Sequence, residues 1–379
     1  MAADSRKWSL ANLAISPAPL LKNMLDSAKV WLDNACRTLA VSQLLVSLCA
    51  PQFSAASPLR IKAGASALHQ VGREFSGIAW AGGHRYYAVE NRENALYPLD
   101  VAVDADGALS CSVGTPVVLA GAVDPEGCAW DAAAGTVWVS MEDTDTPVRE
   151  YDPATGEALR SAPVPQVQVK RRRANFGLEA LAISGDGLAL WTCNEEALDC
   201  DGDRATAACG TVVRVTRFTR ADVRAEWRAD GQWAYRADPL RSDTPTPVSA
   251  PRSGVAALCA LPDDTLLALE REISGVSIRT RIYALDFSGA DSIESKTALA
   301  GQTFAAVSKT LLWEDIGRWS FSGSSHLANY EGLCLGPVAA DGSASLFIVA
   351  DGGNGGAPRI RHLTLHGLPP PDGGAEKRN

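Results

Sequence analysis

The hexapeptide Tyr330-Glu-Gly-Leu-Cys-Leu335 decides the fold, because variants of it occur at four earlier places in the chain. Each copy leads into a turn rich in Gly or Asp and then into a second short apolar run, as at Leu346-Phe-Ile-Val349. Two short runs of β-branched and aromatic residues around such a turn are typical of a β-hairpin, not of a helix. The earlier copies are Phe75-Ser-Gly-Ile-Ala-Trp80, Pro125-Glu-Gly-Cys-Ala-Trp130, Leu178-Glu-Ala-Leu-Ala-Ile183 and Val255-Ala-Ala-Leu-Cys-Ala260. The sequence therefore predicts five hairpins of one design.

The spacing of the copies predicts a β-propeller. Glu126 follows Ser76 by 50 residues and Glu179 follows Glu126 by 53, which suits one four-stranded blade per copy. The next two intervals widen to 77 and 75 residues, which leaves room for insertions or part of a further blade. We therefore expect an all-β propeller of five or six blades, since radial packing of sheets leaves only short edges. Two stacked β-sandwiches are the alternative.

The start of the chain is predicted to be a secretory leader. Residues 39–48 form an apolar run that follows Lys29 and Arg37 and precedes the small residues Ser54-Ala-Ala56. This run is too short to span a bilayer as a helix, and its flanking residues are those of a signal peptide. The chain then has a leader, a propeller domain and a flexible tail, which are residues 1–56, 57–368 and 369–379. We expect the protein to be exported, either periplasmic or secreted.

The composition excludes several classes of protein. A hydrophobic content of 46% is that of a globular protein, and a net charge of −9 with a pI near 5.2 argues against a nucleic-acid partner. No other apolar run approaches the ~20 residues of a membrane-spanning helix, so no transmembrane helix is expected. Cys193, Cys200 and Cys209 crowd one loop, where a disulfide would suit an oxidising compartment. We expect a monomer.

The repeat places acidic side chains in two recurring positions. The first lies at the start of each hairpin's first strand, where Ser76 and Ala256 stand in the two copies without an acid. The second lies at the end of the second strand, where Glu90 is the earliest case. Because inner propeller strands run along the central channel, both positions are expected to meet at its mouth. The other acids of the two positions are Glu126, Glu179 and Glu331, and Glu142, Glu195, Glu270 and Asp351.

Converging carboxylates repel one another and would take up protons unless a cation offsets their charge. Calcium accepts six to eight oxygen ligands with loose geometry, which suits ligands from several blades. Zinc is a poor candidate, because the five histidines show no paired spacing with each other or with cysteine. The predicted calcium ligands are Glu126, Glu142, Glu179, Glu195, Glu270, Glu331 and Asp351. The alternative is that these acids pair with arginines such as Arg173 and Arg271, or cap turns.

Several short segments resemble the phytase-like domain family, whose members are often labelled "esterase-like activity of phytase". The segments are Asn175-Phe-Gly-Leu-Glu-Ala-Leu-Ala182, Leu269-Glu-Arg271, Arg281-Ile-Tyr283, Asn329-Tyr-Glu-Gly-Leu333 and Val349-Ala-Asp351. The resemblance covers roughly residues 70–365. It implies an exported protein with the architecture of β-propeller phytases. Those enzymes hold calcium in an acidic channel mouth and use it to bind and polarise phosphate esters.

The resulting hypothesis is an exported hydrolase of phosphate or related esters. Calcium held by Glu179 and its neighbours would neutralise substrate charge and activate a water molecule, while Arg173 and Arg271 would orient the phosphate. Arg173 ends the only basic cluster, Lys170-Arg-Arg-Arg173, which could instead be a solvated loop. No Gly-x-Ser-x-Gly, His-Glu-x-x-His or P-loop motif is present. The alternative function is a non-catalytic propeller that binds a ligand or serves as a scaffold.

Overall fold

The computed structural model describes residues 58–245, 250–318, 327–352 and 358–369. The predicted leader, and the predicted tail except for Pro369, lie outside these residues. Within the described ranges the only helical element is α2 (Gln166–Lys170), and no helix there has the length and apolarity needed to cross a membrane.

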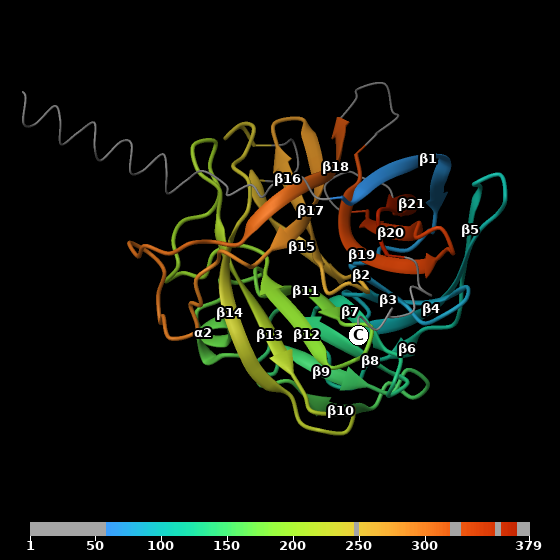
Figure 1. The fold of residues 1–379 in the computed structure, drawn as a ribbon, viewed down its shortest axis with the longest axis horizontal. Helices are drawn as coiled ribbons and strands as arrows, with labels where there is room; N and C mark the ends of the chain where they lie inside the picture. The colour runs from blue at the N-terminus through green and yellow to red at the C-terminus, as the bar shows by residue number, and fades with distance from the viewer. Residues whose placement is uncertain (1–57, 246–249, 319–326, 353–357, 370–379) are drawn as a thin grey trace, which may run out of the picture. The chain divides into compact units, whose positions relative to one another are not determined.

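Five antiparallel sheets make up the fold, so the predicted all-β propeller is confirmed with five blades (Figure 1). Each blade has four main strands. Blade 1 is β2 (Gly77–Trp80), β3 (Arg85–Glu90), β4 (Ala95–Val103) and β5 (Leu109–Val113), and the short strand β6 (Val117–Val118) also pairs with β4. Blade 2 is β7 (Pro125–Asp131), β8 (Thr136–Met141), β9 (Val148–Tyr151) and β10 (Ala158–Ser161). Blade 3 is β11 (Leu178–Ile183), β12 (Ala189–Asn194), β13 (Val212–Thr219) and β14 (Arg228–Arg236). Blade 4 is β15 (Arg252–Ala260), β16 (Leu266–Ser274), β17 (Ser277–Asp286) and β18 (Ser308–Arg318).

Blade 5 joins the two ends of the propeller chain. It contains β19 (Asn329–Val338), β20 (Ala344–Asp351) and β21 (Arg359–His366), and its outer strand is β1 (Arg60–Gln70). β1 pairs antiparallel with β21, and Arg60 lies opposite His366. The earliest strand therefore closes the ring by completing the last blade. This closure hydrogen-bonds the edge of β21, whose backbone groups would otherwise be unpaired.

The five repeat copies form the inner strands β2, β7, β11, β15 and β19, which lie toward the middle of Figure 1. These backbones approach so closely that the residue after the repeat's acid position, which is Ser76 in blade 1, must be small. A Cβ atom on Gly77 would lie 2.5 Å from the carbonyl oxygen of Glu126, and one on Gly127 would lie 2.7 Å from that of Glu179. The Glu-Gly and Glu-Ala pairs of the repeat therefore follow from the narrowness of the channel.

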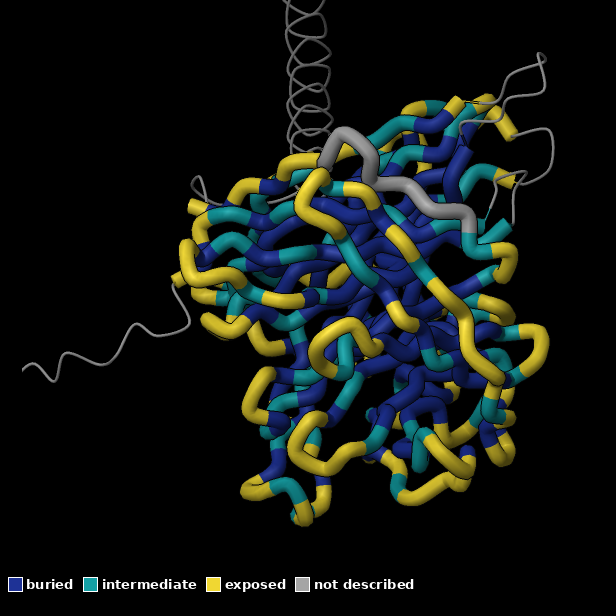
Figure 2. Tube along the Cα trace, turned by 90° about the vertical axis from the view of Figure 1, so that its right-hand side faces the viewer, coloured by how far each residue is buried: buried dark blue, intermediate teal, exposed yellow. Residues whose placement is uncertain are grey.

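Apolar side chains of the inner strands fill the spaces between neighbouring blades. Leu333 of β19 packs in the cluster shared with blade 4, for example, whereas Cys334 packs in the cluster shared with blade 1. This alternation is the period of two that a strand imposes on its side chains. Figure 2 shows the result, with buried backbone in the sheets and exposed backbone at the turns. The wide intervals of the sequence repeat hold long outer strands and loops rather than a sixth blade.

Candidate metal centre

β-Bulges turn the repeat's acids out of the strand ladders. Leu178 pairs with Asn194 and Ala180 with Cys193, so Glu179 between them has no opposite residue. Glu331 is skipped in the same way between β19 and β20. A bulge re-aims a side chain and locally interrupts pairing, which is why bulges are common beside functional sites. Here the bulges lie at one end of the channel and place the carboxylates together there.

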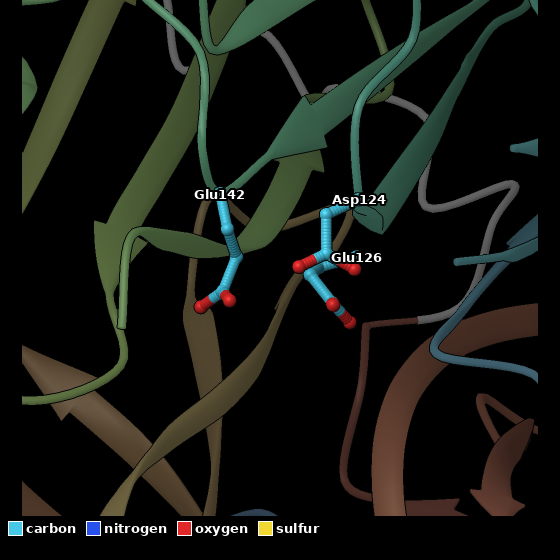
Figure 3. Close-up of side chains that lie close together, drawn as sticks. All are labelled: Asp124, Glu126 and Glu142. Atoms are coloured by element: carbon cyan, nitrogen blue, oxygen red, sulfur yellow. The ribbon is translucent and has the colours of Figure 1, made fainter. Parts of the chain in front are cut away.

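Two groups of three carboxylates form at this channel mouth. In each group one carboxylate oxygen per residue lies within 4.8 Å of the others. Glu142 belongs to both groups, and it follows the last residue of β8. Figure 3 shows the first group, with side chains from β7, from the residue before it and from the end of β8 extending toward a common space. The groups are Asp124, Glu126 and Glu142, and Glu142, Glu179 and Glu195.

Burial and mutual repulsion make these carboxyl groups hard to ionise. Burial, and next the charge of Glu195, raise the pKa of Glu142 to about 8. Burial, and next the charge of Glu331, raise the pKa of Glu126 well above its ordinary range. Burial followed by the charge of Glu126 does the same to the pKa of Glu179. Without a bound cation, these pKa shifts favour the protonated form of the three carboxyl groups.

Arg271 supplies a cation to the other side of the same mouth. Its guanidinium, which is 2% exposed, donates hydrogen bonds to Glu195 and Glu331. Its Nη2 atom lies 3.7 Å from Glu179. Blade 4, which provides Arg271 on β16, has Ala256 where three other blades have an inner-strand acid. The acidic mouth is thus divided into a part neutralised by Arg271 and a part made of Asp124, Glu126 and Glu142, none of which forms an ion pair with another described residue.

A family model described as "Phytase-like: Esterase-like activity of phytase" matches residues 70–352. The chain belongs to this phytase-like family. No curated protein sequence matches it.

Remote similarity to solved structures accompanies this assignment. Aldose sugar dehydrogenase from Streptomyces coelicolor is 14% identical, with 84% of the phytase-like chain and 100% of the other chain covered and a TM-score of 0.36. A gluconolactonase from Xanthomonas campestris is 14% identical, with 85% and 98% covered and a TM-score of 0.31. The calcium-binding protein regucalcin from Agrobacterium tumefaciens is 10% identical, with 80% and 94% covered and a TM-score of 0.36. Similarities at this level say nothing about the chemistry of the site.

Five of the seven predicted ligands of the phytase-like chain gather at the mouth, and Asp351 lies at its margin. Asn329 Nδ2 donates to Glu331 and to Asp351, both at 2.6 Å. Glu270 is held elsewhere in blade 4, where it accepts hydrogen bonds from Tyr235, at 2.6 Å, and from Lys309. The five acids that gather there are Glu126, Glu142, Glu179, Glu195 and Glu331.

The predicted phosphate-orienting arginines are both engaged with the protein. Arg271 is committed to carboxylates, as described above. Arg173 donates from Nε to the carbonyl oxygen of Ala197 at 3.0 Å and from Nη2 to that of Gly202 at 2.8 Å. Their roles in catalysis stay predictions. Cys193 and Cys200 are free thiols, so the crowded cysteines do not form a bridge that includes either of them.

The sequence interpretation missed Asp124 and Glu196. Asp124 lies one residue before β7, and its positive φ of 51° is a conformation that Asp tolerates better than most residues. Glu196 follows Glu195 directly; its side chain is fully buried, and neither carboxylate oxygen accepts a hydrogen bond. Arg204 Nε lies 3.0 Å from it. The available signal was closeness in sequence to a repeat acid, since Asp124 lies two residues before Glu126 and Glu196 directly follows Glu195.

Proposed function

We propose that this phytase-like protein is an exported, calcium-dependent hydrolase of phosphate or related esters. The observation that carries the proposal is the group of Asp124, Glu126 and Glu142, three oxygen donors from different parts of blade 2 within 4.8 Å of one another. The second group shares Glu142 and extends the same cluster to blade 3. Carboxylates this close together repel one another, and a bound cation would offset their negative charge.

The donor set fits calcium better than a softer metal. Every candidate ligand is a carboxylate oxygen, and calcium binds six to eight oxygens at flexible angles. Glu179 adds a separate argument, because it is 5% exposed and no described residue donates a hydrogen bond to its carboxylate, with Arg271 Nη2 at 3.7 Å. A buried carboxylate without a donor is costly unless it is protonated or binds a cation. Calcium at Glu142, with ligands from both groups, would satisfy it.

The chemistry proposed for bound calcium is the polarisation of a phosphoryl oxygen and the activation of water. The residues of the chain would hold and position the reactants. Asp124 is the partly exposed member of its group and marks where the cluster meets solvent. Arg271 fixes Glu195 and Glu331, so these two carboxylates are oriented before any ligand arrives. Two of the three guanidinium nitrogens of Arg173 are bonded to backbone carbonyls, which leaves Nη1 for a substrate anion.

A non-catalytic, cation-binding propeller is the second candidate. It is favoured by the shortage of uncommitted positive charge at the mouth, since Arg271 pairs with carboxylates there. A phosphate ester at the mouth would then depend mainly on calcium for the neutralisation of its charge. The same geometry would suit a protein that captures calcium without turning over a substrate.

Hydrolysis assays with and without chelator test the proposal. The purified protein is assayed with p-nitrophenyl phosphate, phytate and p-nitrophenyl acetate in calcium, and again in EGTA. We expect phosphate release that disappears in EGTA, returns with calcium and falls at least tenfold in Glu142→Gln. Glu157→Gln, which removes the same charge from an exposed position of blade 2, should retain activity. Hydrolysis that persists in EGTA overturns the metal mechanism, and no hydrolysis of any substrate favours the non-catalytic candidate.

A further inference from the structure

A cavity of about 250 Å³ opens at the opposite end of the inner strands from the acidic mouth. The last residue of every repeat copy lines it, and each of these five residues is partly exposed. The same repeat that places acids at one end of the channel therefore places apolar side chains around the other. The five residues are Trp80, Trp130, Ile183, Ala260 and Leu335.

The lining has no charge to offer a ligand. None of the residues that line the cavity has an ionised side chain, and Ser184 is the only one with a hydroxyl. That hydroxyl already donates to Asp186 Oδ1 at 2.5 Å and accepts from the amide of Ala189 at 2.9 Å. Burial keeps the thiols of Cys128 and Cys259 neutral, since it raises the pKa of each to about 12. The cavity therefore suits an uncharged molecule, unlike the anionic substrate proposed for the acidic mouth.

The two Trp side chains are held in place before any ligand binds. Trp80 Nε1 donates to the carbonyl oxygen of Gly83 at 3.0 Å. Trp130 stacks on Tyr87, with ring centroids 5.3 Å apart and an interplanar angle of 27°. A wall of fixed aromatic rings loses little entropy on binding, which favours planar ligands that contact ring faces or edges.

Blade 4 leaves the space open. Its repeat ends in Ala260, whereas the other four copies end in Trp, Ile or Leu. A larger apolar residue at this position would extend into the cavity. Blade 4 therefore departs from the repeat at both ends, with Ala256 at the acidic mouth and Ala260 at the apolar one.

A narrow middle section separates the two ends of the channel. It holds a space of only about 10 Å³, lined by Gly77, Gly127 and Gly332 among others. Such a volume is about that of one water-sized probe. A molecule larger than water does not fit this space, although Glu331 of the acidic mouth lines it. Binding in the apolar cavity and binding of calcium at the acidic mouth are therefore measured separately.

We propose that the apolar cavity is a binding site for an uncharged aromatic molecule of two fused rings. Its size supports this class, because an apolar protein cavity of about 150 Å³ holds benzene and this one is larger, at about 250 Å³. The ring faces of the ligand would lie against Trp80 and Trp130. This proposal does not depend on the proposed calcium chemistry.

The proposal is tested by measuring the binding of 2-naphthol with isothermal titration calorimetry in EGTA. We expect saturable one-to-one binding to the wild-type protein, unchanged when calcium replaces EGTA. 2-Naphthalenesulfonate, which has the same rings and a negative charge, should bind at least tenfold more weakly. Ala260→Trp should weaken 2-naphthol binding at least tenfold, and Ala154→Trp, at an exposed turn of blade 2, should not.

Thermal melts establish that each variant is folded, and Ala260→Leu replaces Ala260→Trp if the larger side chain prevents folding. The proposal is overturned if the wild-type protein shows no saturable binding of 2-naphthol. It is also overturned if a folded cavity-filling variant binds as tightly as the wild type, or if the sulfonate binds as well as the neutral compound.

Discussion

The guanidinium of Arg271 on β16 hydrogen-bonds the carboxylate of Glu331 on β19, so a cation of blade 4 neutralises an acid of blade 5. Arg271 also donates to Glu195 of blade 3, and it thereby links three blades at one end of the channel. Both contacts are buried, and a buried charge is tolerated only when it is paired. Arg271 therefore acts as the internal counter-ion of carboxylates from blades 3 and 5.

Arg271→Gln should destabilise the metal-free protein by about 3–5 kcal/mol, because it leaves buried carboxylates without their cation. Protonation of these glutamates would reduce the loss of stability. Calcium should restore part of this loss, since an added ion can replace the missing charge. Urea unfolding in EGTA and in calcium measures both effects. Arg73→Gln, which removes an exposed arginine paired with Glu93, is the matched control and should leave the unfolding midpoint unchanged. Equal stability of Arg271→Gln and the wild type in EGTA would contradict the counter-ion role.

Glu142→Gln should weaken calcium binding by at least tenfold while leaving the metal-free protein as stable as the wild type or more stable. Glu142 belongs to both carboxylate groups, so its loss removes a ligand from each and also removes repulsion from Glu195. Calcium titration and unfolding in EGTA give the two readouts, with Glu157→Gln as the control for charge. A lower stability in EGTA together with unchanged calcium affinity would show that Glu142 has a purely structural role.

The stability of the metal-free protein should fall as the pH rises from about 4.5 to about 8. Glu142 has a folded pKa of about 8 against an ordinary value of 4.5, so between these values the folded chain holds a proton that the unfolded chain has released. Stability decreases with pH wherever the folded state binds more protons. Calcium binding should correspondingly release protons and tighten as the pH rises. The difference in unfolding free energy between the wild type and Glu142→Gln, measured in EGTA from pH 5 to pH 8, isolates the contribution of Glu142. If the wild type becomes more stable relative to Glu142→Gln as the pH rises, the raised pKa is refuted.

Gly127→Ala should destabilise the protein strongly, by about 2 kcal/mol or more, because the new methyl group has no space. A Cβ atom there would lie 2.6 Å from Ser140 Oγ and 2.7 Å from the carbonyl oxygen of Glu179. Gly289→Ala is the control, since nothing lies within 4 Å of a Cβ at that position and its φ is not positive. Thermal unfolding compares the two variants. If both lower the melting temperature equally, the narrow channel does not explain the Glu-Gly pairs of the repeat.

The sequence predicts the propeller because each repeat copy is a local unit, a strand, a turn and a second strand, whose design is visible within about 20 residues. It leaves the blade count open, because long outer strands such as β17 and β18 widen the later intervals without adding a blade. The pairing of β1 with β21 has no signature in the local sequence, since the two strands lie at opposite ends of the propeller's sequence.

The site is predictable to the extent that the repeat fixes it. Glu126, Glu179 and Glu331 converge because they share one bulged position of the inner strand. Glu270 has the expected place in the repeat, yet its carboxylate accepts hydrogen bonds from Tyr235 on β14 of blade 3 and from Lys309 on β18, the outer strand of blade 4. Such partners depend on packing between strands that are distant in sequence. For the same reason the sequence could not decide whether Arg271 binds a substrate or pairs with carboxylates.

Calcium titration of the chelator-treated protein by calorimetry tests the central claim most directly. The account predicts at least one bound calcium ion per chain, and binding that Glu142→Gln weakens by at least tenfold and Glu157→Gln leaves intact. The absence of any saturable heat at millimolar calcium, with the protein folded, would contradict it.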